Sequence, residues 1–455
     1  MMKNNLAEGV VFGAAGAAVR AAAHAAALAL LLAASTVHAA LPVQSWTAKS
    51  GAKVLFVEAR TIPMIDLNID FDAGARYDPA AKSGLSALTH GLLALGATVE
   101  GVSLNEQQIA DRFADAGAQR GGSAGADRAG ASLRTLSSRP ERELALATLT
   151  GLLATPAFPE AVLTREKARR IAAIKEEDSK PESIAARAFD AALYGAHPYG
   201  RHPTGATMEA ITQADVQAFY RAHYSARRAV VAIIGDVSRA EAEAMAERIS
   251  AGLPAGSAAP ALLPVPAQKA VEVRIPHPAT QSHILTGSAV LKRGDPDFFP
   301  LTVGNYILGG GGFVSRLMEQ VREQRGLAYS VYSYFSPLAQ EGPFQAGLQT
   351  KKDQANDALA LVRQVIAGYA AQGPSAKELR AAKDNLVGGF ALRIDSNRKI
   401  LDNLAVIGFY GLPLDYLDTW SANVEKVTVE DIRSAMRRRV KPEQFSTVVV
   451  GAPGQ

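Results

Sequence analysis

The side chains best suited to chemistry are an arginine and a tyrosine seven residues apart. Arg322 lies at the end of a predicted helix, FVSRLMEQVRE (313–323), and Tyr329 begins a predicted alternating strand, AYSVYSYF (328–335). A guanidinium and a phenol both donate hydrogen bonds, so together they can hold a carbonyl oxygen and the negative charge that develops on it. The alternative is a structural role, with Arg322 on a helix surface and Tyr329 on a sheet face.

A second stretch, GLSALTHGLLALGA (84–97), places a histidine on a predicted helix. Its leucines recur at helical spacing, so one side of the helix is expected to pack inward. A helix of this kind carries a zinc site when it reads H-x-x-E-H. Two histidines four residues apart then face the metal together, and the glutamate reaches the zinc-bound water. Only His90 is present here, and a lone histidine on a packed helix is more often a partly buried structural residue.

Few other side chains are candidates for catalysis. No two histidines have the H-x-x-x-H spacing, although His197 and His202 stand close together on a Pro/Gly-rich turn, GAHPYGRHP (195–203). The sequence has no cysteine, which excludes a thiol nucleophile. GGGG (309–312) is not followed by G-K-[ST], so it is expected to form a flexible turn before a helix and not a phosphate loop.

Length, composition and charge indicate a globular chain that does not bind nucleic acid. The 455 residues suffice for two domains of about 200 residues each. Hydrophobic residues make up 48% of the chain and charged residues 20%, which excludes a disordered protein. The formal net charge is +4, and the densest basic run, RSAMRRRVK (433–441), contains no aromatic residue. It is therefore expected to be a solvated helix end.

Residues 1–39 are predicted to form a secretory signal peptide. Lys3 and Arg20 precede the apolar run AAALALLLAA (25–34), and the small-residue exit Val37-His38-Ala39 follows it. The apolar run is too short to span a bilayer, so no membrane span is expected. An exported chain without cysteine fits the bacterial periplasm.

The rest of the sequence contains one module twice. ITQADVQAFYRAHYSARRAVVAIIGDVS (211–238) aligns without a gap with VTVEDIRSAMRRRVKPEQFSTVVVGAPG (427–454). Each copy predicts a capped helix followed by a buried strand that ends in glycine. The linker PAGSAAPALLPVPAQ (254–268) separates a predicted N-terminal domain, 41–253, from a predicted C-terminal domain, 269–455. The predicted fold class is α+β, with each domain a mainly antiparallel sheet packed against helices.

The order of these features resembles the M16 peptidase family, which includes pitrilysin and the mitochondrial processing peptidases. The features are a strand, Asp78-Pro79, the G-L-x-x-L helix, the later H-P-Y-G turn and the repeated C-terminal half. The resemblance covers essentially the whole chain after the signal peptide and implies two homologous LuxS/processing-peptidase-like domains. It also implies that Arg322 and Tyr329 match a family pair that binds the peptide backbone and stabilises the tetrahedral intermediate.

The same resemblance implies that this chain has lost its zinc site. Active members carry H-F-L-E-H on the first helix. The corresponding positions here place Ala87 and Gly91 where the two histidines stand and His90 where the glutamate stands. Alanine and glycine side chains have no donor atoms. The third family ligand, a glutamate on a later helix, corresponds to Glu176 or Glu177, and one carboxylate alone does not hold zinc. No metal or other cofactor is expected in this chain.

In heterodimeric M16 peptidases one subunit carries the zinc, and the other lacks it and contributes the Arg/Tyr pair. The resemblance therefore predicts the non-catalytic, substrate-binding subunit of a periplasmic zinc peptidase. Its partner would be a homologous M16 subunit with H-x-x-E-H and the zinc, and its substrate a peptide or unfolded polypeptide. Two alternatives remain. One is a peptide-binding or structural protein without a catalytic partner. The other is an autonomous metallopeptidase that uses His90, Glu176 and the turn with His197 and His202.

Overall fold

The chain builds two large β-sheets, one from each half of the sequence. The computed structural model describes residues 41–256, 261–267 and 269–451, so the predicted signal peptide and part of the predicted linker lie outside the described residues. From Pro42 onward the described residues form one compact unit. No helix among them is long and apolar enough to cross a membrane.

The first sheet has six strands in the order β1-β2-β8-β3-β7-β6. Strands β2 and β8 run parallel, and the other neighbours run antiparallel. The strands are β1 (Gln44–Thr47), β2 (Lys53–Glu58), β3 (Met64–Phe71), β6 (Gln119–Ala124), β7 (Ala129–Leu136) and β8 (Ala229–Gly235). A small hairpin, β4 (Gly96–Val99) with β5 (Val102–Asn105), stands apart from this sheet. Strand β6 lies at an edge and has one neighbour, β7.

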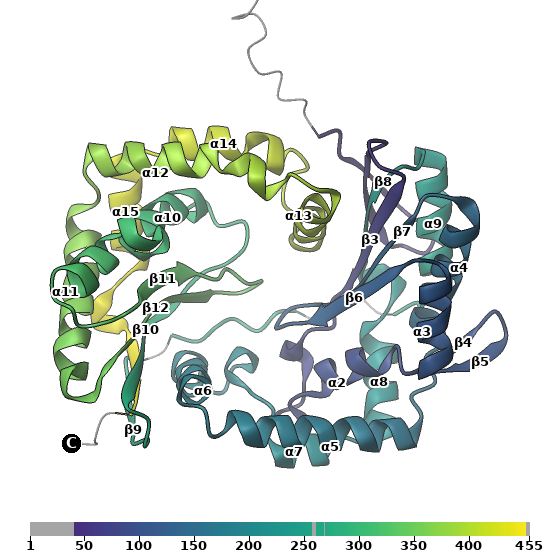
Figure 1. Cartoon of the computed structure of the whole chain (residues 1–455), viewed down its shortest axis with the longest axis horizontal. Coiled ribbons are helices and arrows are strands. Elements are labelled where there is room, and N and C mark those ends of the chain that lie inside the picture. The colour runs from purple at the N-terminus through teal and green to yellow at the C-terminus, as the bar shows by residue number, and fades with distance from the viewer. Residues whose placement is uncertain (1–40, 257–260, 268, 452–455) are drawn as a thin grey trace, which may run out of the picture. The chain divides into compact units, whose positions relative to one another are not determined.

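Helices of the first half surround this sheet. They are α2 (Leu85–Leu92), α3 (Glu106–Asp115), α4 (Arg139–Ala154), α5 (Glu160–Glu177), α6 (Pro181–Tyr194), α7 (Gly205–Glu209), α8 (Gln213–His223) and α9 (Arg239–Ala251). Figure 1 shows α3, α4 and α9 along one side of the sheet. Their apolar side chains form one continuous core with the inward-facing residues of β2, β3, β7 and β8.

The second sheet has five strands in the order β11-β12-β10-β13-β9, all antiparallel except the pair β13–β9. The strands are β9 (Glu272–Ile275), β10 (Gln281–Leu291), β11 (Val331–Phe335), β12 (Gly342–Lys351) and β13 (Ser446–Val450). The helices of this half are α10 (Phe298–Asn305), α11 (Ala355–Gln372), α12 (Ala376–Gly388), α13 (Asn397–Tyr410), α14 (Tyr416–Lys426) and α15 (Val429–Arg439). The predicted α+β class with mainly antiparallel sheets is confirmed.

The repeated module forms as its sequence predicts. Helix α8 begins at a capping box in which Thr212 accepts from the backbone N–H of Asp215, and α15 begins at the same box between Thr428 and Asp431. The strands that follow, β8 and β13, are buried along their whole length, as β-branched runs favour. The two copies therefore provide the same helix and central strand to the two sheets.

Each sheet receives one covering helix from the other half of the chain. Helix α13 packs on β8, β3 and β2, and α6 packs on β10 and β13. Figure 1 shows α13 on the side of the six-stranded sheet opposite α3, α4 and α9. Because both faces of a largely apolar sheet must be covered, each half needs the other's helix. The domain division at 254–268 remains a proposal about sequence organisation, since the packing crosses it twice.

Candidate functional site

Helix α2, which carries the predicted zinc-motif positions, is held by the Asp78-Pro79 turn. The Asp78 carboxylate accepts hydrogen bonds from the backbone N–H groups of Gly84 and Ser86, each at 2.8 Å. Gly84 has φ +102°, a conformation that favours glycine and lets the chain turn into the helix. Burial raises the pKa of Asp78 to about 6, although the backbone hydrogen bonds oppose the shift. The D-P turn of the sequence is therefore the N-terminal cap of α2.

An arginine from α5 lies against Ala87 and Gly91, the two predicted zinc-motif positions. The Nη2 atom of Arg170 donates to the backbone oxygen of Ala87 at 2.9 Å. A Cβ atom added at Gly91 would lie 2.8 Å from the same Nη2. This place does not fit a divalent metal ion. The side chains of Ala87 and Gly91 offer no ligand atoms, and the Arg170 guanidinium would repel a cation. A side chain at position 91 would have to displace this guanidinium.

His90 lies half-buried beside this arginine and beside β6. Burial, reinforced by the charges of Arg120 and Arg170, lowers the pKa of His90 to about 4, so the imidazole is neutral at pH 7. Its Nδ1 atom is buried and has no hydrogen-bond partner in the described structure. The stretch GGSAG (121–125) beside it has the spacing of a serine-nucleophile motif. Residues 121–124 lie within β6, however, and β7 follows, so the stretch does not make the strand-to-helix turn of such a site.

The predicted third ligand faces away from this place. The Glu176 side chain is 71% exposed and pairs with Lys180 at 2.9 Å, and Glu177 accepts from Ser183 and Lys180. Both lie six or seven residues beyond Arg170 on α5, roughly 9–10 Å along the helix. Among the described residues, no hydrogen bond or ion pair joins either carboxylate to α2.

The two histidines of the H-P-Y-G turn already have partners. His197 is buried, with Nε2 3.2 Å from the Leu263 oxygen and Nδ1 accepting from the Tyr199 N–H at 3.2 Å. His202 contacts the Asp190 carboxylate at 2.9 Å. Across the residues that the structure describes, no three side chains of histidine, aspartate and glutamate gather closely enough to hold a metal ion.

The structure brings Arg322 and Tyr329 together and adds a third side chain to them. Arg322 lies on a π-helical turn, Met318–Glu323, and its guanidinium carbon is 5.3 Å from the centre of the Tyr329 ring and 4.7 Å from that of Phe313. Tyr329 is 82% exposed and Phe313 70% exposed. Tyr329 precedes β11 and does not begin it, so its ring is free of the sheet. Phe313 was missed from sequence, although its place directly after GGGG is a usable signal.

The two groups of predicted site residues come from different halves of the chain. The α2 positions come from the first half and the Arg322/Tyr329 pair from the second. No hydrogen bond or ion pair between described residues joins the two groups. Arg322 pairs instead with its neighbour Glu323 at 2.9 Å.

Comparison with known proteins places the chain in a family. Residues 210–386 match the family model described as Peptidase M16 inactive domain. The structure superposes on the M16 inactive domain of Pseudomonas fluorescens with a TM-score of 0.86 and 39% sequence identity, over 91% of this chain and 99% of that chain. The chain belongs to the M16 peptidase family. Its matched domain and its site agree in marking an inactive-type member.

Some curated relatives of this M16 chain are named zinc proteases, and one is named a non-peptidase homolog. An uncharacterized zinc protease of Streptomyces coelicolor is 30% identical over 252 residues, which are 54% of this chain and 54% of the relative. The chain thus spans about half the length of that relative. The non-peptidase homolog YmxG of Helicobacter pylori is 26% identical over 405 residues, 87% of this chain and 91% of the relative.

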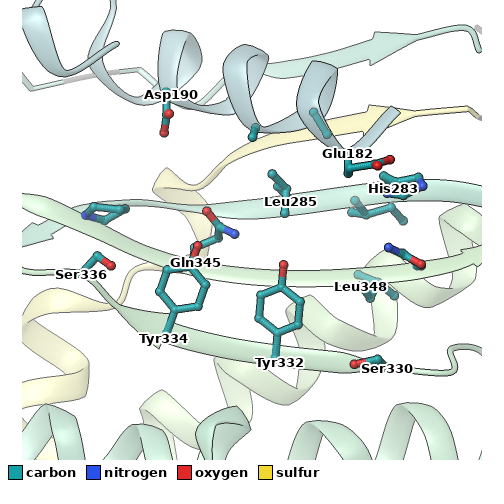
Figure 2. A pocket seen from close by; sticks show the side chains of 15 residues that line it. Glu182, Asp190, His283, Leu285, Ser330, Tyr332, Tyr334, Ser336, Gln345 and Leu348 are labelled. Carbon is teal, nitrogen blue, oxygen red and sulfur yellow. The ribbon is translucent and has the colours of Figure 1, made fainter. Parts of the chain in front are cut away.

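A groove of about 450 Å³ lies between α6 and the edge of the second sheet in this M16 chain. Figure 2 shows Tyr332 and Tyr334 of β11 with their hydroxyls directed towards α6, and Glu182 and Asp190 above them. The two rings stack at 5.9 Å with an interplanar angle of 6°. Burial, then the nearby Tyr332 and Asp190, raises the pKa of Tyr334 to about 12. The groove lining has two carboxylates and no lysine or arginine.

Restoring the zinc motif alone is expected to fail. The native chain is expected to bind no stoichiometric zinc, and Ala87→His with His90→Glu and Gly91→His is expected to bind it weakly, because the Arg170 guanidinium remains beside the new ligands. Adding Arg170→Glu exchanges that cation for a donor and is expected to raise zinc affinity at least about tenfold. Competition with a chromogenic chelator measures the difference.

The matched control adds Arg169→Glu to the same triple variant. Arg169 is the neighbouring residue on α5, with a side chain 79% exposed. Equal zinc affinity in the Arg169 and Arg170 variants would show that Arg170 does not block the metal position.

Proposed function

We propose that this chain is the non-catalytic, substrate-binding subunit of a heterodimeric M16 zinc peptidase. The observation that carries the proposal is the half-buried Arg322 guanidinium between the exposed rings of Tyr329 and Phe313, in a chain whose own motif positions, Ala87 and Gly91, have no donor side chains. Two hydrogen-bond donors at the surface, with no cluster of metal ligands beside them in the described part of this chain, are best explained by a site that another chain completes. The partner is proposed to be an M16 subunit with H-x-x-E-H.

The proposed roles follow from the side chains. Zinc held by the partner supplies an activated water and polarises the scissile carbonyl. The Arg322 guanidinium donates to a carbonyl of the bound peptide backbone, and the Tyr329 hydroxyl donates to the oxygen on which negative charge develops. The Phe313 ring also packs against the guanidinium and limits the directions in which its N–H groups can point.

The groove in Figure 2 supports a substrate-binding role for the same subunit. Its tyrosine hydroxyls and the Gln345 amide offer hydrogen bonds to an extended backbone, and its two carboxylates favour positively charged side chains. A peptide or unfolded polypeptide is the proposed substrate. The predicted signal peptide supports export to the periplasm, where such substrates occur.

Two other functions make different forecasts. An autonomous metallopeptidase would need free donors at His90, Glu176, His197 and His202, and three of these side chains already have other partners. A peptide-binding or structural homologue without a catalytic partner would bind polypeptides but would not change the activity of any peptidase.

Mixing the chain with an exported M16 chain that carries H-x-x-E-H is the direct test. We expect a one-to-one complex by light scattering and peptidase activity well above that of the partner alone, inhibited by a chelator. The chain by itself is expected to cleave nothing. If every such chain exported by the same host leaves this protein monomeric and gains no activity, the heterodimer proposal is wrong.

A further inference from the structure

Two arginines at the former zinc position have no carboxylate of their own. Among the described residues, no ion pair within 4 Å involves Arg120 or Arg170. The carboxylate whose charge acts on Arg120 is that of Glu106, and the carboxylate whose charge acts on Arg170 is that of Glu166. Glu106 pairs with Arg165 at 2.8 Å, and Glu166 pairs with Arg165 at 3.0 Å. The local carboxylates are therefore already engaged elsewhere.

Arg120 points to the same side of β6 as the α2 helix. Alternate residues of a strand share a face, so Arg120 and Gly122 face the same way. A Cβ atom added at Gly122 would meet the backbone of β7 and would lie 3.1 Å from Cε1 of His90, and α2 packs on β6, so this strand lies against α2 at His90. Arg120 and Arg170 consequently approach His90 from two different elements, the edge strand and α5.

The two guanidinium groups have hydrogen-bonding capacity to spare. Each carries five N–H donors, and among the described residues the one hydrogen bond from either group is that from Arg170 to the Ala87 oxygen. Burial lowers the pKa of both arginines, although the Arg120 side chain keeps an exposed part and Arg170 is half-buried. The small residues at 87 and 91 let the Arg170 guanidinium approach the backbone of α2.

We propose that Arg120 and Arg170 form a binding site for a carboxylate of a bound polypeptide. A fixed protein cation would thus take the place that a metal ion occupies in an active member of the family. Guanidinium groups bind planar carboxylates through paired, charge-assisted hydrogen bonds. The ligand is either the terminal carboxylate or an acidic side chain, which share this chemistry. The inference rests on the proposed substrate-binding role and adds that the bound polypeptide is held by one of its carboxylates.

The first test uses a probe too small to need the rest of the substrate site. N-acetylglycinate is titrated into the ¹⁵N-labelled mature protein, and the arginine Nε–H signals are followed by NMR. Saturable shifts of the Arg120 and Arg170 signals are expected, and N-acetylglycinamide, which lacks the charge, is expected to cause none. Equal responses to both probes, or no response to either, would overturn the proposal.

The second test compares ten-residue peptides by fluorescence polarisation. A free C-terminal carboxylate and an internal aspartate with an amidated terminus are measured against a neutral, amidated peptide. The peptide whose carboxylate enters the site is expected to bind at least about tenfold more tightly than the neutral peptide. Arg170→Gln and, separately, Arg120→Gln are expected to abolish that advantage. Arg169→Gln, on the exposed side of α5, is expected to keep it.

The two variants keep the result decisive. Arg120 is exposed on an edge strand, so Arg120→Gln is expected to fold even if Arg170→Gln is less stable. A carboxylate advantage that survives both substitutions would refute the assignment. Failure of the heterodimer proposal has a separate sign, the absence of gained activity on mixing with a partner, and N-acetylglycinate binding does not depend on it.

Discussion

Asp127→Ala is expected to lower the free energy of unfolding by about 3–5 kcal/mol, the largest stability effect expected of a single polar substitution in this chain. Asp127 is 2% exposed and accepts four hydrogen bonds. Two come from the first half, from Arg76 and the Tyr199 hydroxyl. The other two come from the second half, from the Ala339 N–H at 2.8 Å and the Tyr410 hydroxyl at 2.9 Å.

Removing this carboxylate leaves a buried charge with too few partners. The Arg76 side chain is 9% exposed, and although burial opposes it, the charges of Asp72 and Asp127 raise the pKa of Arg76. Without Asp127 the guanidinium keeps only Asp72 and the Tyr77 hydroxyl. The loss exceeds that of an ordinary hydrogen bond because a buried cation is then incompletely paired.

Urea unfolding followed by fluorescence measures the effect. Tyr410→Phe removes one donor to Asp127 without creating an unpaired charge, so it is expected to cost only about 1 kcal/mol. Asp178→Ala breaks an ion pair with Arg187 whose carboxylate is 60% exposed, and is expected to cost less than about 1 kcal/mol. An Asp127→Ala midpoint equal to that of the Asp178 variant would contradict this account.

The parts of the fold that local sequence dictates could be predicted, and the parts that depend on long-range packing could not. The Thr-x-x-Asp boxes and the β-branched runs after them determine α8, β8, α15 and β13 from neighbouring residues alone. Helix α6 gives no such sign of its destination. The apolar side of α6 could pack on either sheet. Its contacts with β10 and β13 join distant parts of the chain, and the local sequence does not reveal them.

The site shows the same division. The sequence reveals which donors are missing at Ala87 and Gly91, because an absent side chain needs no structure to be recognised. It does not reveal that Arg170, 79 residues after Gly91, fills the space, since that contact depends on how α5 crosses α2. Glu176 was the natural choice of carboxylate from sequence, but its position on α5 turns it to solvent and to Lys180.

Arg322→Ala and Tyr329→Phe are each expected to lower kcat/KM of the heterodimer by roughly ten- to a thousandfold. This is the range for losing a charged or oxyanion-stabilising donor. Tyr329→Phe removes only the hydroxyl, and a ring that is 82% exposed contributes little to folding, so the variant is expected to be as stable as the native chain. Zinc content of the partner is expected to stay the same, because neither residue would be a metal ligand.

Arg325→Ala is the matched control, since it removes an exposed arginine three residues after Arg322. If both arginines act only by attracting the substrate through their positive charge, the two variants would lose activity equally, and the loss would fade at high salt. A specific donor at Arg322 predicts a loss in kcat that persists at high salt and a small effect from Arg325. The double variant, Arg322→Ala with Tyr329→Phe, is expected to lose less than the product of the single losses, because both donors act on one bound peptide. Wild-type turnover by the doubly substituted complex would refute the role assigned to the pair.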